Sequence, residues 1–363
     1  MARLIAFYLP QYHPIPENDE WWGKGFTEWT NVAKAKPMFR GHYQPHIPAD
    51  LGFYDLRVPE TRNAQAELAR KYGIEAFCYY HYWFAGKRIL ERPFTEVLHT
   101  GTPDLPFCLC WANQTWTGIW HGCPDRILVE QTYPGYEDHR AHFDALLPAF
   151  TDKRYVTVDG KPLFLVYRWD EIPNVREVTD FWRTLALKAG LKGLHLVAVL
   201  HHKDDWNPGD HGFDACVRSY LRQRKDGFIS WRRPVKKIYR YLERKSGRPI
   251  VFPYDKVLMD VFPDNFSDRS EYLCLMPNWD NTPRCGTAGV VLEGSTPELF
   301  RFQVRKSMEL TKDTPLERRI IFVKSWNEWA EGNHVEPDLE FGTGFLDVLR
   351  QEVHTVRRGD PLP

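Results

Sequence analysis

The stretch RIIFVKSWNEWAEGNHVEP, residues 319–337, decides how the rest of this chain is interpreted. It opens with a continuous apolar run, Ile320 to Val323, which is typical of a strand buried on both faces in a parallel sheet. Two carboxylates three residues apart follow, Glu328 and Glu331, bracketed by tryptophans. Carboxyl pairs break glycosidic bonds, and flat aromatic rings suit sugar faces. The stretch therefore predicts an active site at a strand end; the alternative is a capped turn with solvated glutamates.

Strand-like runs recur along the whole chain, with helical patterns between most of them. Eight alternations of strand and helix predict a closed (β/α)8 TIM barrel, with residues 1–363 as one catalytic domain. A doubly wound open sheet is the alternative, but no Gly-rich phosphate loop follows the first run. The predicted strands are Leu4–Leu9, Ala76–Tyr80, Phe107–Cys110, Leu163–Tyr167, Leu194–Leu200, Asp214–Val217, Tyr272–Met276 and Ile320–Lys324.

Four stretches carry helix signals. Residues 59–73 and 174–190 have apolar side chains at helical spacing, and each ends in a glycine. Residues 296–311 begin with Thr296 as a candidate N-cap and a proline in the first turn. Residues 344–356 would close the set.

Two segments interrupt the rhythm. Residues 14–57, between the first strand and the first helix, form a connection so long that we expect a wall or lid over the barrel mouth. Residues 219–270 form an insertion after the sixth strand. Its basic piece, residues 230–247, is interpreted as a solvated helix face rather than an anion site.

Polar and aromatic side chains cluster directly after the strands rather than before them. Since chemistry in (β/α)8 enzymes sits at the carboxyl ends of the strands, we expect Gln11, His81, Asn113, Arg168, Asp280 and Glu328 at one end of the barrel. The predicted catalytic residues are Glu328 and Glu331. The predicted substrate-binding residues are Tyr12, His13, Tyr80, His81, Trp83, Lys87, Glu91, Trp111, Asn113, Gln114, Trp116, Arg168, His202, Trp279, Asp280, Trp326 and Asn327.

The two glutamates are not expected to form a helical pair, because Gly332 and Pro337 would end any helix early. Both should project from a strand-to-loop turn into the mouth. Burial against tryptophan would keep one carboxyl protonated while hydrogen bonds keep the other ionised, which is the split in pKa that acid/base work requires. The sequence gives no distance between them, so retention and inversion both stay open.

Several of the substrate-binding predictions have plain structural alternatives. The stretch WANQTW, residues 111–116, suits a sugar through its amides and indoles, or is a packed loop with aromatic anchors. Lys87 and Glu91 either face the substrate or pair with each other at i,i+4 spacing. Of the adjacent His201 and His202, at most one would face the lumen, because neighbouring strand residues point to opposite faces.

No metal and no cofactor are predicted. Glu331-x-x-His334 and Glu96-x-x-His99 match the pattern of carboxylate-bridged metal sites, but those sites need a helical bundle. Seven cysteines, most of them inside apolar runs and none in a CxxC pair, are interpreted as buried thiols of a reducing compartment.

Composition excludes several partners. The formal net charge is zero, which favours neither nucleic acid nor an anionic membrane. No run is long enough for a membrane span, and the N-terminus lacks a signal-peptide pattern, so we expect a cytoplasmic protein. The expected partner is an oligo- or polysaccharide substrate. The oligomeric state is not indicated.

The chain resembles the WbsX-like proteins, which are similar to the endo-α-mannosidases. The resemblance covers nearly the whole chain and is carried by FYLPQYHPIPENDEWWGKGFTEW (7–29), YYHYWFAGKRILERP (79–93), WANQTWTG (111–118) and SWNEWAEGNHVEP (325–337).

The resemblance implies a (β/α)8 barrel and a retaining, substrate-assisted glycosidase. It implies that Glu328 is the base that takes the proton of the sugar 2-hydroxyl, and that Glu331 is the acid. Two alternatives stand beside this hypothesis. One is a glycosyltransferase of O-antigen or capsular polysaccharide biosynthesis, although no clear nucleotide or lipid-phosphate site is seen. The other is a glycan-binding barrel without catalysis, against which the intact carboxylate pair argues.

Overall fold

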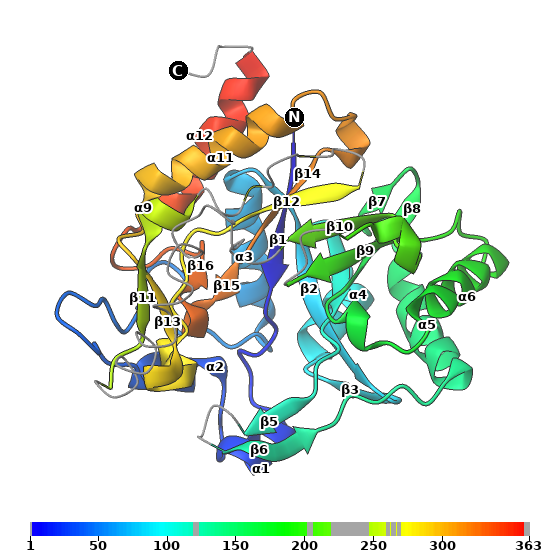
Figure 1. Ribbon diagram of the computed structural model, residues 1–363, viewed down its shortest axis with the longest axis horizontal. Helices are drawn as coiled ribbons and strands as arrows, with labels where there is room; N and C mark the ends of the chain where they lie inside the picture. Colours follow the sequence, from blue (N-terminus) through cyan, green and yellow to red (C-terminus); the bar gives the residue numbers. More distant parts are fainter. Residues whose placement is uncertain are drawn as a thin grey trace.

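A computed structural model of the protein describes residues 2–118, 123–201, 206–218, 247–258, 262, 266 and 270–358. Eight parallel strands form its centre, and the last strand, β14, pairs with the first, β1, which also pairs with β2. This pairing closes the sheet into a barrel (Figure 1). In barrel order the strands are β1 (Arg3–Tyr8), β2 (Ile74–Phe84), β4 (Phe107–Trp111), β8 (Lys161–Val166), β9 (His195–Leu200), β10 (Ala215–Arg218), β12 (Glu271–Leu275) and β14 (Ile320–Val323).

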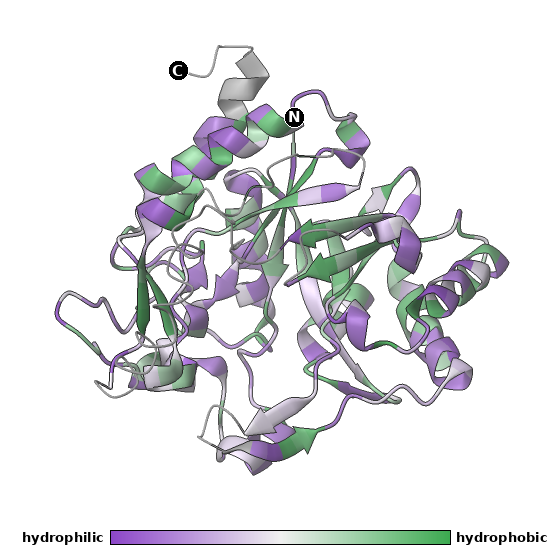
Figure 2. Ribbon diagram, viewed as in Figure 1, coloured by the Kyte–Doolittle hydropathy of each residue, from purple (hydrophilic) through white to green (hydrophobic). Residues whose placement is uncertain are grey.

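The barrel strands are apolar on both faces, because one face fills the lumen and the other packs under helices. Every residue of β4, β9, β10, β12 and β14 is buried. Hydrophobic residues gather on the central strands, whereas the outer helices carry many hydrophilic ones (Figure 2). Burial of this continuous apolar surface is the main source of stability of such a core.

Helices cover the outside of the barrel. Their bounds follow the predicted signals: α3 ends one residue before Tyr72, and Gly73 takes a left-handed φ of 84°. The side chain of Thr296 caps α11 by accepting a hydrogen bond from the backbone N–H of Leu299. The outer helices are α3 (Pro59–Lys71), α4 (Arg92–Thr100), α5 (Tyr136–Phe150), α6 (Val175–Lys188), α11 (Pro297–Thr311) and α12 (Gly344–Arg358).

Short elements stand on the loops at the carboxyl ends of the strands. The first loop holds α1 (Pro16–Trp22) and α2 (Glu28–Lys34), and the hairpin of β5 (Trp116–Gly118) and β6 (Cys123–Val129) lies beside α1 (Figure 1). There Trp21 and Trp116 meet edge to face, with ring centroids 5.8 Å apart. A separate two-stranded sheet joins β11 (Ile250–Pro253) to β13 (Val290–Glu293), and β3 (Lys87–Ile89) and β7 (Thr157–Val158) pair with barrel strands.

The predicted barrel is confirmed. All eight predicted strands and all four predicted helices are present, with shifts of a few residues at their ends. The repeat is irregular between β9 and β10, where the described residues hold a 3-10 turn, Pro208–His211. Of the insertion after the sixth strand, the described part contains β11 and the short helix α9 (Tyr254–Val257), while the predicted basic helix, but for Gly247, lies outside the described residues. No described helix has the length and apolar character needed to cross a membrane.

Candidate active site

The two glutamates lie on a tight turn at the end of β14. Glu328 ends the two-residue strand β15 (Asn327–Glu328), and Glu331 ends a 3-10 turn, Trp329–Glu331. Gly332 stops the turn with a left-handed φ of 58°, a conformation that glycine adopts without steric cost. The chain then returns as β16 (Asn333–His334), antiparallel to β15. The glycine thus keeps the pair out of a helix, as the sequence predicts.

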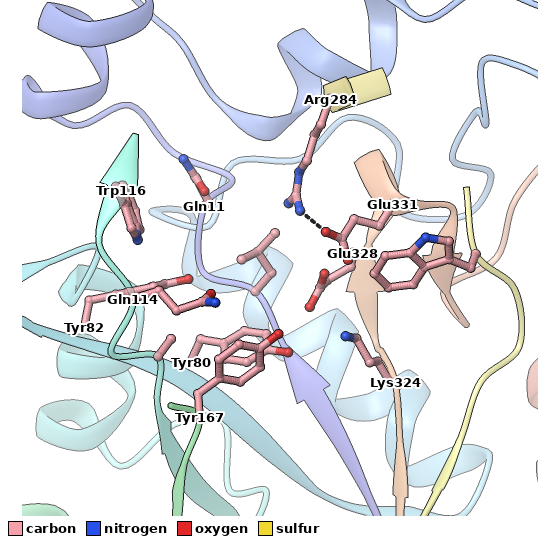
Figure 3. A pocket seen from close by; sticks show the side chains of 13 residues that line it. Gln11, Tyr80, Tyr82, Gln114, Trp116, Tyr167, Arg284, Lys324, Glu328 and Glu331 are labelled. Atoms are coloured by element: carbon pink, nitrogen blue, oxygen red, sulfur yellow. Dashed lines mark hydrogen bonds and ion pairs between the residues drawn. The ribbon is translucent and has the colours of Figure 1, made fainter. Parts of the chain in front are cut away.

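Both carboxyl groups face a cavity at the carboxyl ends of the barrel strands. Its volume is about 160 Å³. In Figure 3 the carboxyls lie between Arg284 and Lys324, across from Gln114 and Trp116. The lining combines aromatic rings with polar groups, which is typical of sites that fix a polar ligand in one orientation. The lining residues are Leu9, Gln11, Tyr80, Tyr82, Ala112, Gln114, Trp116, Tyr167, Trp279, Arg284, Lys324, Glu328 and Glu331.

Glu331 is held in its ionised form by a neighbouring cation. The guanidinium of Arg284 donates a hydrogen bond to Glu331 at 2.5 Å and pairs with the buried Glu28 at 2.8 Å. Burial alone would raise the pKa of Glu331, but the charge of Arg284 and a hydrogen bond from Glu328 outweigh it and keep that pKa below its usual value. Glu331 is therefore a carboxylate at neutral pH.

Glu328 behaves in the opposite way. Burial, reinforced by the negative charge of Glu331, raises the pKa of Glu328 to about 8. Lys324 works against this rise, since its cation favours the ionised form. Because the two carboxyls also share a hydrogen bond, they hold one proton between them at neutral pH, and in the free site that proton sits on Glu328.

Lys324 is a buried cation at the cavity wall. The residue is 4% exposed, and its ammonium lies 4.9 Å from the centroid of the Trp279 ring. No hydrogen bond joins the ammonium to another residue in the described part of the chain. Burial alone would lower the pKa of Lys324, but neighbouring acidic groups raise it, so the ammonium stays charged. Its donors are therefore available to a ligand in the cavity.

Buried hydrogen bonds fix the turn to the first strand. The side chain of Asn327 accepts from the backbone N–H of Leu9 at 2.7 Å and donates to the carbonyl of the same residue at 3.0 Å. The Tyr12 hydroxyl donates to the carbonyl of Asn327 and accepts from the N–H of Trp329. The Ser325 hydroxyl accepts from the N–H of Glu328. These bonds leave the turn little freedom to move its carboxyls.

Two further carboxylates brace the turn from behind. Asp280 accepts from His42 at 2.7 Å and from Gln44 at 2.6 Å, and its backbone N–H donates to the carbonyl of Glu331. Glu336 accepts hydrogen bonds from Tyr54, Gln65 and the indole of Trp329. Neither of these two carboxylates lines the cavity.

The structure brings together only part of the predicted site. Beside the two glutamates, four predicted substrate-binding residues line the cavity, and their role in binding stays a prediction. Five others support the site from outside the lining: Trp326 is fully buried, and Asn113 donates to Tyr133 and to the carbonyl of Arg168. The four are Tyr80, Gln114, Trp116 and Trp279. The five are Tyr12, Asn113, Asp280, Trp326 and Asn327.

Three predicted residues point outward, under the helices, instead of into the cavity. His81 lies 2.9 Å from His142 of α5, and Trp83 stacks on the same imidazole. Trp111 is 1% exposed and packs on Trp182 of α6. The strands are apolar on both faces, so the sequence did not reveal which side chains face the lumen.

The remaining predicted residues lie apart from the cavity lining. His13 bonds the carbonyl of Pro10. Lys87 pairs with Glu17 at 2.8 Å rather than with Glu91, which precedes α4 as its N-cap. Arg168 forms ion pairs with Asp170 and Glu171. His202 lies outside the described residues.

Sequence reasoning missed several lining residues. Lys324 had a recognisable signal, a lysine directly after a strand of buried residues; Tyr167 directly follows β8, and Tyr82 lies near the end of β2. Arg284 had none, because it sits on α10 (Thr282–Cys285), a short helix in the loop after β12, 47 residues before Glu331.

Comparisons with known sequences match nearly the whole chain. A family model described as Glycosyltransferase WbsX matches residues 4–349. Two curated relatives from strains of Xanthomonas campestris pv. campestris, each described as uncharacterized protein WxcX, are 38% identical over 351 residues. The match covers 96% of this chain and 49% of each relative, so the chain spans about half the length of the curated relatives it matches.

Solved structures share the fold at low sequence identity. The GH99 endo-alpha-mannosidase of Bacteroides thetaiotaomicron superimposes with a TM-score of 0.57 and 13% identity, covering 98% of both chains. A structure described as a glycoside hydrolase-like protein gives a TM-score of 0.56 at 14% identity, covering 97% of this chain and 93% of the other. The fold is thus one that glycoside hydrolases use.

Proposed function

This chain belongs to the Glycosyltransferase WbsX family, and we propose that it is a carbohydrate-active enzyme. The reaction that we propose is cleavage of a glycosidic bond of an α-mannoside-like glycan. The observation that carries the proposal is the pair Glu328 and Glu331, two carboxyls that share one proton in a cavity at the barrel mouth. Carboxyls whose pKa values are held apart are the equipment of general acid/base catalysis. The fold shared with an endo-alpha-mannosidase favours the glycosidic bond as the target.

The proposed mechanism is retaining and substrate-assisted. In the first step Glu328, as carboxylate, takes the proton of the sugar 2-hydroxyl while that oxygen attacks the anomeric carbon. The bond to the leaving oxygen breaks, Glu331 donates its proton to that oxygen, and a 1,2-anhydro sugar forms. In the second step Glu331 takes a proton from water, the water oxygen attacks the anomeric carbon, and the 2-oxygen recovers its proton from Glu328.

The charges around the pair favour the first step. Before it, the proton has to reside on Glu331; after it, Glu328 is protonated and Glu331 is ionised. This second distribution is the one that Arg284 and the burial of Glu328 stabilise in the free site. Groups fixed in advance to stabilise charge that develops during the reaction are the largest source of catalysis in many enzymes. By stabilising the ionised form of Glu331, Arg284 would favour transfer of the proton from Glu331 to the leaving oxygen.

A glycosyltransferase is the second candidate. It is favoured by the description of the family and by Lys324, whose ammonium has donors available to a ligand in the cavity. An activated sugar donor carries a phosphate, and a buried ammonium is a suitable partner for one.

Product analysis of the purified protein with α-mannosides, other bacterial glycans and sugar nucleotides separates the two candidates. We expect release of a sugar with retained anomeric configuration from a glycan without any nucleotide donor, and release at least about 100-fold slower by the variant Glu328→Gln. Turnover that requires a sugar nucleotide or a lipid-phosphate donor would establish the transferase instead. Comparable turnover of 2-hydroxy and 2-deoxy substrates would rule out substrate assistance.

A further inference from the structure

Two histidines and an aspartate meet beside the catalytic turn, outside the cavity lining. His46 comes from the first βα loop, His334 from β16, and Asp338 from the segment that follows it. One nitrogen of each histidine and one carboxylate oxygen all lie within 4.8 Å of one another. The three residues are 5%, 4% and 3% exposed, respectively. We propose that they bind one divalent transition-metal ion, such as Zn²⁺, which ties the first βα loop to the catalytic turn.

The donor set suits such an ion. Imidazole and carboxylate are ordinary Zn²⁺ ligands, and two histidines with one carboxylate leave a position open. Nε2 of His334 lies 3.1 Å from Oδ2 of Asp338. Two ligands about 2.1 Å from a tetrahedral zinc are separated by about 3.4 Å, so this pair already stands at nearly the required spacing. The ligand atom of His46 lies within 4.8 Å of both others, so it has to approach by about 1.4 Å at most to reach that spacing.

Contacts behind the ligands hold them in orientation. The second oxygen of Asp338 accepts hydrogen bonds from the backbone N–H groups of Glu340 and Phe341, at 3.0 and 2.7 Å. The ring of His334 stacks on Trp329 with centroids 3.7 Å apart. Partners that fix the ligating side chains are a regular feature of metal sites.

The backbones that carry the ligands are already joined. The N–H of Ala49 donates to the carbonyl of Pro337, and the N–H of Leu339 donates to that of Ile47. Pro48 and Asp338 form an isolated antiparallel bridge. The site therefore exists before an ion arrives, so little ordering of the chain opposes binding.

A hydrogen-bond network without metal explains the cluster less well. It accounts for the contact between His334 and Asp338, but it leaves Nδ1 of His46 and Nδ1 of His334 buried without a hydrogen-bond partner among the described residues. An unsatisfied buried polar atom costs about 1–3 kcal/mol. An ion that takes Nδ1 of His46 as a ligand removes one of these two deficits. This inference departs from the sequence-based expectation of no metal: the pattern Glu331-x-x-His334 contains one of the proposed ligands, but the proposed carboxylate ligand is Asp338.

Calorimetric titration of the chelator-treated full chain with Zn²⁺ tests the proposal. We expect one ion per chain, and a thermal unfolding midpoint raised by about 3–5 °C when free Zn²⁺ is about a hundredfold above Kd. His46→Gln and Asp338→Asn should each weaken binding by about 100-fold or more. The matched control is His81→Gln, which alters a buried histidine pair that has no carboxylate and should leave Zn²⁺ binding unchanged.

A second measurement covers variants that do not fold. Crystals of the wild-type protein grown with Co²⁺ should give an anomalous scattering peak between His46, His334 and Asp338. The proposal is overturned by the absence of a stoichiometric site, by a peak elsewhere with none at these residues, or by folded His46 and Asp338 variants that bind Zn²⁺ as well as the wild type does. None of these outcomes depends on the glycosidase activity.

Discussion

At the scale of single residues, the chemistry depends on how neighbours divide one proton between two carboxyls. Glu328 and Glu331 are three residues apart on one turn, yet their pKa values move in opposite directions. The difference comes from placement, since Arg284 contacts one carboxyl directly while the other is buried without a matching ion pair. Single substitutions can test the contribution of each of these residues.

Replacing either glutamate by glutamine should leave the fold intact and reduce turnover by roughly 10²–10⁴-fold, the usual range for loss of a general acid or base. The leaving group should distinguish the two. An acid is needed mainly for a poor leaving group, so an activated aryl glycoside should partly rescue Glu331→Gln but not Glu328→Gln. Steady-state kinetics with natural and aryl substrates measures this. Full activity of either variant on a natural glycan would remove the pair from the mechanism.

The pH dependence of kcat/KM should reveal the proton shared by the pair. The raised pKa of Glu328, about 8, predicts that kcat/KM falls as pH rises above about 8, because the pair then loses its only proton. Lys324 lowers this pKa, so Lys324→Met should shift the alkaline limb to higher pH. Lys312→Met removes an exposed lysine that pairs with Glu309 and serves as the control. An alkaline limb that moves to lower pH in Lys324→Met would contradict the assignment.

At the scale of elements, the turn that carries Glu328 and Glu331 depends on the glycine that ends it, Gly332, and on the residue that packs against that glycine, Asp280. The turn follows β14 at the barrel mouth. At Gly332 the chain reverses direction close to Asp280 of the neighbouring loop. A Cβ added at Gly332 would stand 3.0 Å from Cβ and 3.1 Å from the backbone nitrogen of Asp280. That nitrogen donates to the carbonyl of Glu331, so crowding there would also displace this proposed catalytic residue.

Gly332→Ala and Gly342→Ala form a matched pair. Both glycines have a left-handed φ, 58° and 54°, but an added Cβ at Gly342 meets nothing within 4 Å. Gly342→Ala should therefore lose about 1 kcal/mol of stability through backbone strain alone. Gly332→Ala should lose about 1–3 kcal/mol more through crowding. Chemical denaturation measures both variants. Equal losses would mean that Asp280 moves aside freely.

At the scale of the whole molecule, contacts between the outer helices contribute to the stability of the protein although they lie outside the cavity lining. α11 and α12 lie side by side near the N-terminus of the chain (Figure 1). Glu352 of α12 is 2% exposed and pairs with Arg301 and Arg305 of α11, at 2.6 and 2.9 Å. Removing one partner of a buried ion pair leaves the others uncompensated.

Glu352→Gln should destabilise the protein by about 2 kcal/mol, less than for a fully buried pair because both arginines are partly exposed. That loss lowers the unfolding midpoint by about 2–4 °C. Activity per folded molecule should not change. Glu309→Gln, which breaks an exposed pair, is the control and should shift the midpoint by less than about 1 °C. A thermal melt with parallel activity assays tests this, and a change in kcat/KM would show that the helices influence the site.

The sequence by itself determined the strands, the helices and the end of the barrel at which the polar residues collect. Those features follow from local patterns: apolar runs of strand length, helical periodicity, and glycines and prolines at the ends. It also placed Glu328 and Glu331 together, because two residues three positions apart on one turn cannot lie far from each other.

Only the tertiary structure decided which side chains reach the cavity and which partners set their charge. Tyr80 and His81 are neighbours in β2, yet only Tyr80 lines the cavity, while His81 and Trp111 of β4 face the outer helices. A strand that is apolar on both faces does not reveal which alternate residues point inward. Arg284 joins Glu331 from a distant loop. Such contacts depend on the closure of the barrel and on the path of its loops, and no local sequence pattern predicts them.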